Sequence, residues 1–200
     1  MLTPGNIPEK DITGVILAGG KSSRYGSNKA LVKIEGIPLI ERVATVMQSL
    51  FEHVFLITNT PDEYAYLGFP MYEDLIKGLG PLGGIYTAMT AIPNSGGFFV
   101  PCDMPFLNPY LIRHMVEIRE NYDAVVPRIS ENIEALHAFY SNRCLTAVKK
   151  LIDRREYQIF RFFPEVSVRY VEEAEIRGFD SQLRSLLNIN WPEEAKELIS

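Results

Sequence analysis

The chain has 200 residues, of which 46% are hydrophobic and 22% charged, and both values are typical of a globular protein with a sizeable core. The formal net charge is −5, from 20 Lys and Arg against 25 Asp and Glu, so we expect no nucleic acid among its partners. No apolar run reaches the roughly 18–20 residues that cross a bilayer, so we expect no membrane partner either.

Apolar segments typical of strands alternate with segments of helical spacing along the whole chain. The predicted strands are residues 12–18, 54–58, 71–72, 97–101, 123–127, 135–140 and 166–171. The predicted helices are residues 38–50, 85–92, 108–120, 144–153 and 193–199, and residues 128–132 form a polar connection. This alternation predicts an α/β fold with a mostly parallel sheet and helices on both faces. We find no repeat and no break in composition, so we expect one domain over residues 1–200.

Polar residues and glycines follow four of the predicted strands. In open α/β sheets, ligands bind outside the carboxyl ends of the strands. The residues at these four exits are Gly19-Gly20, Asn59, Asp74 and Asp103. We therefore expect them to converge on one crevice.

The loop after the first strand combines glycines with cations. The buried run of residues 15–18 leads into Gly19-Gly20, and Lys21, Arg24, Lys29 and Lys33 follow. Glycines expose backbone N–H groups, and cations around such groups favour a phosphate. We expect Arg24 and Lys29 to serve the phosphate and Lys33 to be solvated. The spacing of the glycines matches neither a P-loop nor the dinucleotide fingerprint.

Residues 17–39 follow the string L-A-G-G-x-S-x-R-x-G-x-x-K-x-L-x-x-x-x-G-x-P-L. This string resembles the signature of nucleotidyltransferases that activate sugars, isoprenoid precursors and pterin cofactors. Over its full length the chain is most similar to the molybdenum cofactor guanylyltransferases. Residues 80–84, 100–105 and 188–194 match that family's second glycine loop, metal-binding strand end and asparagine-proline motif. The resemblance implies a Rossmann-like three-layer sandwich of the nucleotide-diphospho-sugar transferase type.

The resemblance also implies a reaction and its participants. The family transfers GMP from GTP to the terminal phosphate of the molybdopterin (Mo-molybdopterin) cofactor, which forms the guanine dinucleotide cofactor and releases pyrophosphate. Mg²⁺ is the implied cofactor, because it takes few protein carboxylates and relies on substrate phosphates. The implied partners are GTP, molybdopterin, other proteins of cofactor synthesis and the recipient molybdoenzymes.

Carried over to this chain, the family's site residues have three roles. The catalytic residues are Arg24, Lys29 and Asp103, of which Asp103 is also the metal ligand. The nucleotide-binding residues are Leu17, Ala18, Gly19, Gly20, Lys29, Asn59, Asp74, Gly83 and Asp103. The residues near the metal or the pterin substrate are Asn188 and Asn190.

Several of these residues have ordinary structural alternatives. Asp103, Asp74 and Asn59 stand in strings that often form turns. The pair Gly83-Gly84 either offers free N–H groups at a helix start or allows close packing. The two cysteines, far apart and without metal-ligand spacing, suit a reducing cytoplasm, and we expect Cys102 to pack in the sheet.

The chain departs from the family pattern at a few positions, and other functions stay open. Tyr25 and Asn28 stand where Met and Asp are common, and Ile57 stands where some members carry an asparagine. Asn28 removes a charge beside Lys29. The alternatives are a cytidylyltransferase acting on the same pterin, a sugar- or polyol-phosphate nucleotidyltransferase, and a non-catalytic nucleotide-binding partner. The combination of Arg24, Lys29 and Asp103 argues against the last.

Overall fold

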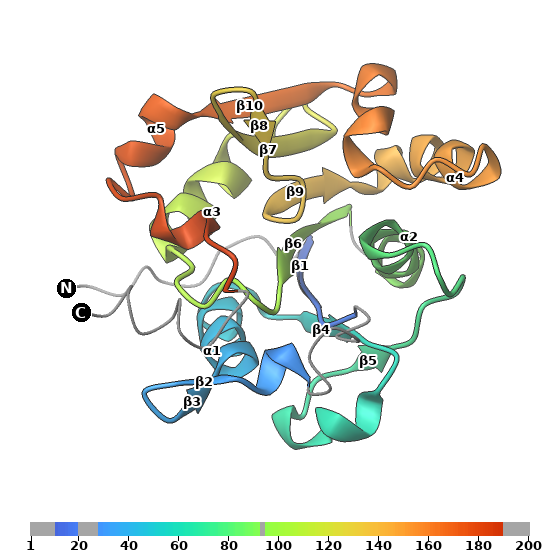
Figure 1. Ribbon diagram of the computed structural model, residues 1–200. Helices are drawn as coiled ribbons and strands as arrows, with labels where there is room; N and C mark the ends of the chain where they lie inside the picture. The colour runs from blue at the N-terminus through green and yellow to red at the C-terminus, as the bar shows by residue number, and fades with distance from the viewer. Residues whose placement is uncertain (1–10, 20–27, 93–94, 190–200) are drawn as a thin grey trace.

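The centre of the molecule is a mixed β-sheet (Figure 1). The structure is a computed structural model that describes residues 11–19, 28–92 and 95–189. Within these residues eight strands form the sheet, in the order β10-β7-β9-β6-β1-β4-β5, with β8 paired to β7. Their bounds are β1 Ile12–Leu17, β4 Val54–Ile57, β5 Met71–Tyr72, β6 Gly96–Pro101, β7 Ala124–Ile129, β8 Asn132–Ile133, β9 Ala138–Ser141 and β10 Val168–Glu172. A separate two-stranded ribbon pairs β2 (Lys33–Ile34) with β3 (Ile37–Pro38).

The predicted mostly parallel sheet is confirmed. Strand β1 pairs in parallel with both β4 and β6, so that Ile16 lies opposite Leu56 on one side and Val100 on the other. Strands β4 and β5, and likewise β7 and β10, are also parallel. Strand β9 runs antiparallel to its neighbours β6 and β7. Apolar side chains alone did not reveal this reversal, because a strand buried on both faces looks the same in either direction.

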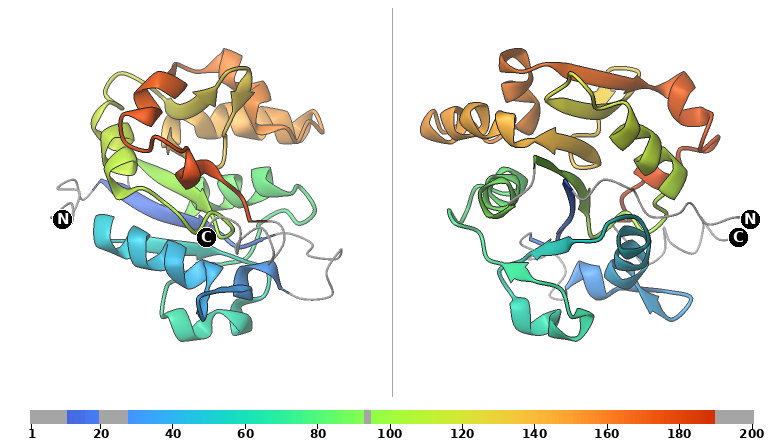
Figure 2. Two further views of the ribbon diagram at one scale, coloured as in Figure 1. Left: turned by 60° about the vertical axis from the view of Figure 1, so that its left-hand side comes forward. Right: turned by 180° about the vertical axis from the view of Figure 1, so that it is seen from behind.

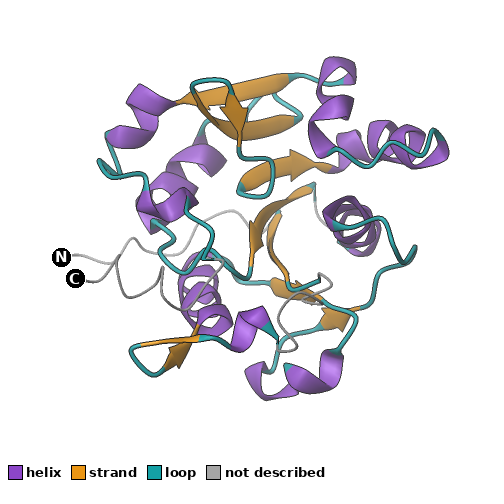
Figure 3. Cartoon of the chain, in the orientation of Figure 1, coloured by secondary structure: helices purple, strands orange, loops and turns teal. Residues whose placement is uncertain are grey.

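Helices cover both faces of the sheet, as predicted (Figures 2 and 3). Helices α1 (Leu39–Leu50) and α3 (Pro109–Glu117) pack on one face, and α2 (Pro81–Ala91) and α4 (Leu145–Asp153) on the other. Side chains alternate between the two cores along β1: Ile12 and Ile16 face α1 and α3, whereas Val15 and Leu17 face α2 and α4. The arrangement is the expected three-layer sandwich. No helix in the described part of the chain is long and apolar enough to cross a membrane.

Several predicted boundaries were wrong. Helix α2 begins at Pro81 rather than at residue 85, because proline suits the first helical turn. The predicted connection 128–132 forms part of a hairpin, since β7 extends to Ile129 and pairs with β8. Short helices also escaped prediction, among them the 3₁₀ segment Ile159–Glu165 and α5 (Glu173–Arg177). The predicted helix 193–199 lies outside the described residues.

His137 is a fully buried histidine just before β9. Its ring packs edge-on against Phe98, with ring centroids 5.3 Å apart. Neither ring nitrogen has a hydrogen-bond partner among the described residues. Burial lowers the pKa of His137 from 6.5 to about 3, so the imidazole is neutral in the folded protein at neutral pH.

We predict that replacing His137 with Leu makes the free energy of unfolding less dependent on pH on the acid side of neutrality. Below pH 6.5 the unfolded chain protonates this histidine while the folded chain does not until about pH 3. The unfolded state therefore binds the extra proton, and wild-type stability falls with decreasing pH by up to ~1.4 kcal/mol per pH unit. Urea unfolding at pH 7, 6 and 5 measures the slope. His53→Leu, at an exposed position, is the control and should keep the wild-type slope.

Candidate active site

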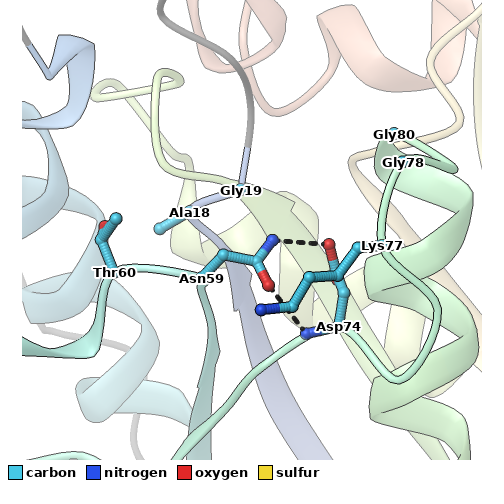
Figure 4. Close-up of a pocket in the computed structure, with 8 residues that line it drawn as sticks. All are labelled: Ala18, Gly19, Asn59, Thr60, Asp74, Lys77, Gly78 and Gly80. Atoms are coloured by element: carbon cyan, nitrogen blue, oxygen red, sulfur yellow. Dashed lines mark hydrogen bonds between the residues drawn. The ribbon is translucent and has the colours of Figure 1, made fainter.

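A pocket of about 570 Å³ opens at the carboxyl ends of β1, β4 and β5 (Figure 4). These strands are neighbours in the sheet, and parallel strands end at the same edge. The residues that line the pocket are Ala18, Gly19, Asn59, Thr60, Asp74, Lys77, Gly78 and Gly80. The structure thus brings together three of the four strand exits singled out in the sequence.

Asn59 and Asp74 hold each other in a closed pair of hydrogen bonds. The Asn59 Nδ2 atom donates to Asp74 Oδ2 at 2.8 Å, and the Asp74 backbone N–H donates to Asn59 Oδ1 at 3.2 Å (Figure 4). The pair joins the exits of β4 and β5, which the backbone bond from Thr58 N to Tyr72 O also connects. A carboxylate fixed in this way presents a preorganised acceptor to a ligand in the pocket.

The second glycine loop contributes to the pocket through other glycines than the one predicted. Gly83 lies inside α2, and its N–H donates to Gly80 O at 3.0 Å, so the expected free N–H at this residue is wrong. A Cβ atom on Gly84 would lie 3.1 Å from Leu17 Cδ2, which shows that this glycine allows α2 to approach β1. The packing interpretation of Gly83-Gly84 therefore holds. Gly78 and Gly80, with φ of 89° and 60°, line the pocket instead.

Lys77 is a pocket residue that the sequence analysis missed. It lines the pocket beside Asp74, and Figure 4 shows its side chain extending toward the side that carries Asn59. The Glu73 carboxylate lies 2.9 Å from Lys77 Nζ, and this contact raises the pKa of the lysine. The ammonium group therefore stays charged and adds a cation at the pocket. In the sequence it is one charge in a polar loop, with no spacing that distinguishes it.

Lys29 and Asp103 form an ion pair at the exit of β6, the neighbour of β1. Lys29 Nζ lies 2.7 Å from Asp103 Oδ2, and the two side chains are 19% and 22% exposed. Lys29 begins a short 3₁₀ turn, Lys29–Leu31, whereas Asp103 follows β6, which is tied to β1 by the bond from Cys102 N to Leu17 O. The structure thus brings together two predicted catalytic residues that are 74 positions apart.

The second carboxylate oxygen of Asp103 fits a metal ligand. Oδ1 is buried and has no hydrogen-bond partner among the described residues. A buried oxygen of this kind is costly unless it meets a donor or a cation. No group of three or more His, Cys, Asp or Glu side chains among the described residues could hold a metal ion. A divalent ion at Asp103 would therefore take its other ligands from a bound substrate and water, as Mg²⁺ does with nucleotide phosphates.

Three further residues around Asp103 are Asn188, Glu134 and Cys102. The backbone N–H of Ile189 donates to Asp103 O at 2.8 Å, which places the exposed Asn188 next to this exit. Burial, and to a lesser degree the negative charge of Asp103, raise the pKa of Glu134. Burial also raises the pKa of Cys102 to about 12, so this thiol is unsuited to act as a nucleophile.

The predicted residues Gly20, Arg24 and Asn190 lie outside the described part of the chain.

Comparison with known proteins agrees with this geometry. The family model described as MobA-like NTP transferase domain matches residues 14–170. The chain is 37% identical over 182 residues to a probable molybdenum cofactor guanylyltransferase of Pelotomaculum thermopropionicum, covering 91% of this chain and 89% of the relative. It is 35% identical to a protein of the same description from Carboxydothermus hydrogenoformans, covering 95% of this chain and 96% of the relative.

The fold is shared as well. The structure superposes on molybdopterin-guanine dinucleotide biosynthesis protein A from Archaeoglobus fulgidus with a TM-score of 0.79 and 25% sequence identity, covering 92% of this chain and 95% of that one. Sequence and fold agree over most of the chain. The chain therefore belongs to the MobA-like NTP transferase family and, within it, to the molybdenum cofactor guanylyltransferases.

Proposed function

We propose that this protein transfers GMP from GTP to the terminal phosphate of molybdopterin, forming the guanine dinucleotide cofactor and releasing pyrophosphate. The names of the curated relatives favour this reaction over the cytidylyl and sugar-phosphate alternatives. The observation that carries the proposal is the ion pair of Lys29 and Asp103 beside a pocket at three adjacent strand exits. It provides one cation for phosphate and one carboxylate oxygen for a metal.

The chemistry requires neutralisation of charge more than proton transfer. A phosphate oxygen of the acceptor attacks the α-phosphorus of GTP, and the bond to pyrophosphate breaks. Both substrates are anions, so the transition state needs fixed cations around the phosphates. In this proposal Lys29 contacts the phosphates, and Arg24 adds a second cation. Mg²⁺ held at Asp103 would neutralise further charge on the triphosphate.

The pocket would hold the nucleoside part of GTP. Backbone groups of Leu17, Ala18, Gly19 and Gly20 would bind the nucleotide. Asn59 and Asp74, fixed by their mutual hydrogen bonds, would contact the nucleotide directly. Gly83 would contribute by letting the preceding loop pack close to α2, because a Cβ atom at this position would lie 3.1 Å from Ile76 O. Asn188 would contact the metal or the pterin acceptor, because the neighbouring Ile189 is bonded to Asp103. The resemblance to the family implies the same role for Asn190.

We infer that residues 1–200 act as one nucleotidyltransferase domain in the cytoplasm. Other proteins of cofactor synthesis and recipient molybdoenzymes would deliver and accept the pterin. The two cysteines are free in the structure, which is compatible with a reducing compartment.

We predict that Asp103→Asn lowers turnover by roughly 100-fold or more, equivalent to about 2.7 kcal/mol of transition-state stabilisation. The amide keeps the size of the side chain and loses the charge that would hold the metal. Pyrophosphate release with GTP, Mg²⁺ and molybdopterin measures the loss, and circular dichroism checks the fold. Asp153→Asn, at the exposed end of α4, is the control and should be fully active. Unchanged turnover in Asp103→Asn would remove this residue from the metal site.

We predict that Lys29→Met both weakens GTP binding and slows the chemical step, each by about tenfold or more, because a charge-assisted contact to phosphate is lost. Titration calorimetry gives the affinity and single-turnover kinetics give the rate. Lys33→Met changes the same kind of side chain at an exposed position a few residues away, and it should behave as wild type. Equal losses in the two variants would show that overall charge, rather than Lys29, matters.

We predict that GTP stabilises the protein against unfolding and that CTP does so much less. With Mg²⁺ present, a ligand at roughly 100-fold above its Kd adds about 2.7 kcal/mol to the free energy of unfolding. Thermal unfolding with GTP, CTP, UTP and dTTP at equal concentrations compares the bases. Stabilisation by CTP without stabilisation by GTP would contradict the guanylyl assignment.

A further inference from the structure

The side chain of Asn28, directly before Lys29, makes three hydrogen bonds. Its Oδ1 accepts the backbone N–H of Ala30 at 3.0 Å, which caps the turn Lys29–Leu31. Its Nδ2 donates to Glu63 Oε2 at 2.5 Å and to Tyr64 Oη at 2.6 Å. A primary amide has two N–H donors, and both are used here. The side chain is therefore fixed at both ends.

The partners of Asn28 belong to the segment that follows β4. The Tyr64 ring is 2% exposed and packs in the core shared by α1, α3 and the sheet. Burial raises the pKa of Tyr64 to about 12, so its hydroxyl is neutral and can accept from the amide at any physiological pH. Asn59 and Thr60, four or five residues earlier, line the nucleotide pocket. Asn28 thus connects the Lys29 turn to the segment that forms one pocket wall.

The same turn is also held by the ion pair of Lys29 with Asp103. Lys29 Nζ reaches Asp103 Oδ2 at 2.7 Å, and the next residue of the turn, Ala30, is 2% exposed. We propose that Asn28 is a positioning residue that fixes the Lys29 ammonium group at Asp103 through its bonds to Glu63 and Tyr64. This inference rests on the proposed function, in which Lys29 contacts the phosphates.

The chemistry of the three contacts requires an amide at position 28. An aspartate could still cap the turn, because its oxygen accepts from the Ala30 N–H. It could not donate to Glu63, and its charge would lie against the Glu63 carboxylate. Two like charges at hydrogen-bond distance repel, so the turn Lys29–Leu31 would move away from Glu63. With aspartate at position 28 and glutamine at position 63, the amide of residue 63 would donate to the carboxylate of residue 28. The hydrogen bond between the two positions would be restored in the reverse direction.

The test is a set of four variants measured together. Asn28→Asp should lower kcat at least tenfold with little change in Tm. Glu63→Gln should stay within threefold of wild type, because the glutamine oxygen still accepts from Asn28. The double variant Asn28→Asp/Glu63→Gln should recover to within about threefold of wild type. Asn28→Ser keeps a capping oxygen but loses the two amide N–H donors that bond to Glu63 and Tyr64, so it should behave like Asn28→Asp. It replaces Asn28→Asp in the test if that variant does not fold. Gln48→Glu, at an exposed position of α1, is the control for the change of charge.

A second readout does not require turnover. Acylation of Lys29 by acetic anhydride, followed by mass spectrometry with Lys33 as the internal reference, reports how firmly the ammonium group is held. The rate should rise at least threefold in Asn28→Asp and return in the double variant. If wild type fails to transfer GMP while acylation follows this pattern, the proposed function is wrong and the positioning role stands. If wild type is active and Asn28→Asp changes Tm but neither kcat nor acylation, the residue is only structural and the inference is overturned.

Discussion

Lys29 and Asp103 meet at 2.7 Å although they lie 74 positions apart, and each side chain is about one fifth exposed. A partly buried pair of this kind gains little net stability, because desolvation of both charges offsets most of their attraction. What the pair does supply is a cation and an acid fixed at one point of the sheet edge. In the proposed reaction, a triphosphate and a divalent ion would give Lys29 and Asp103 new and more highly charged partners. The pair is therefore well suited to open in favour of substrate.

The position of that pair depends on the sheet beneath it. Strands β6, β1 and β4 are parallel neighbours, so Asp103, Ala18 and Asn59 leave the sheet at the same edge. Close approach of α2 to this edge requires glycine, because a Cβ atom on Gly84 would lie 3.1 Å from Leu17 Cδ2. The tightly packed layers on both faces leave the exits as the place where backbone groups and polar side chains can meet a ligand.

The pattern of apolar residues along the chain predicted the strand exits well, because burial of a strand on both faces and the parallel order of strands can be inferred from short stretches of sequence. Prediction from the sequence failed where a structural feature depends on residues that are far away along the chain. The reversed direction of β9 is set by its pairing with β6 and β7. Gly83 appeared to open a helix, yet the helix begins at Pro81 and leaves Gly78 and Gly80 at the pocket. Lys77 had no distinguishing spacing, and only the fold shows that it borders the pocket.

Asn28 connects the two parts of the candidate site, the Lys29 turn and the pocket. Its amide bonds to Glu63 and Tyr64, a few residues beyond the pocket residues Asn59 and Thr60. A nucleotide bound against Asn59, as proposed, would therefore contact the same segment that anchors the Lys29 turn. Because Tyr64 is buried in the core, this segment has little freedom to shift when a ligand binds. In the proposed function, the distance between the pocket and the Lys29 ammonium group would then be set by the fold before substrate arrives, which is the condition for stabilising a transition state without reorganisation.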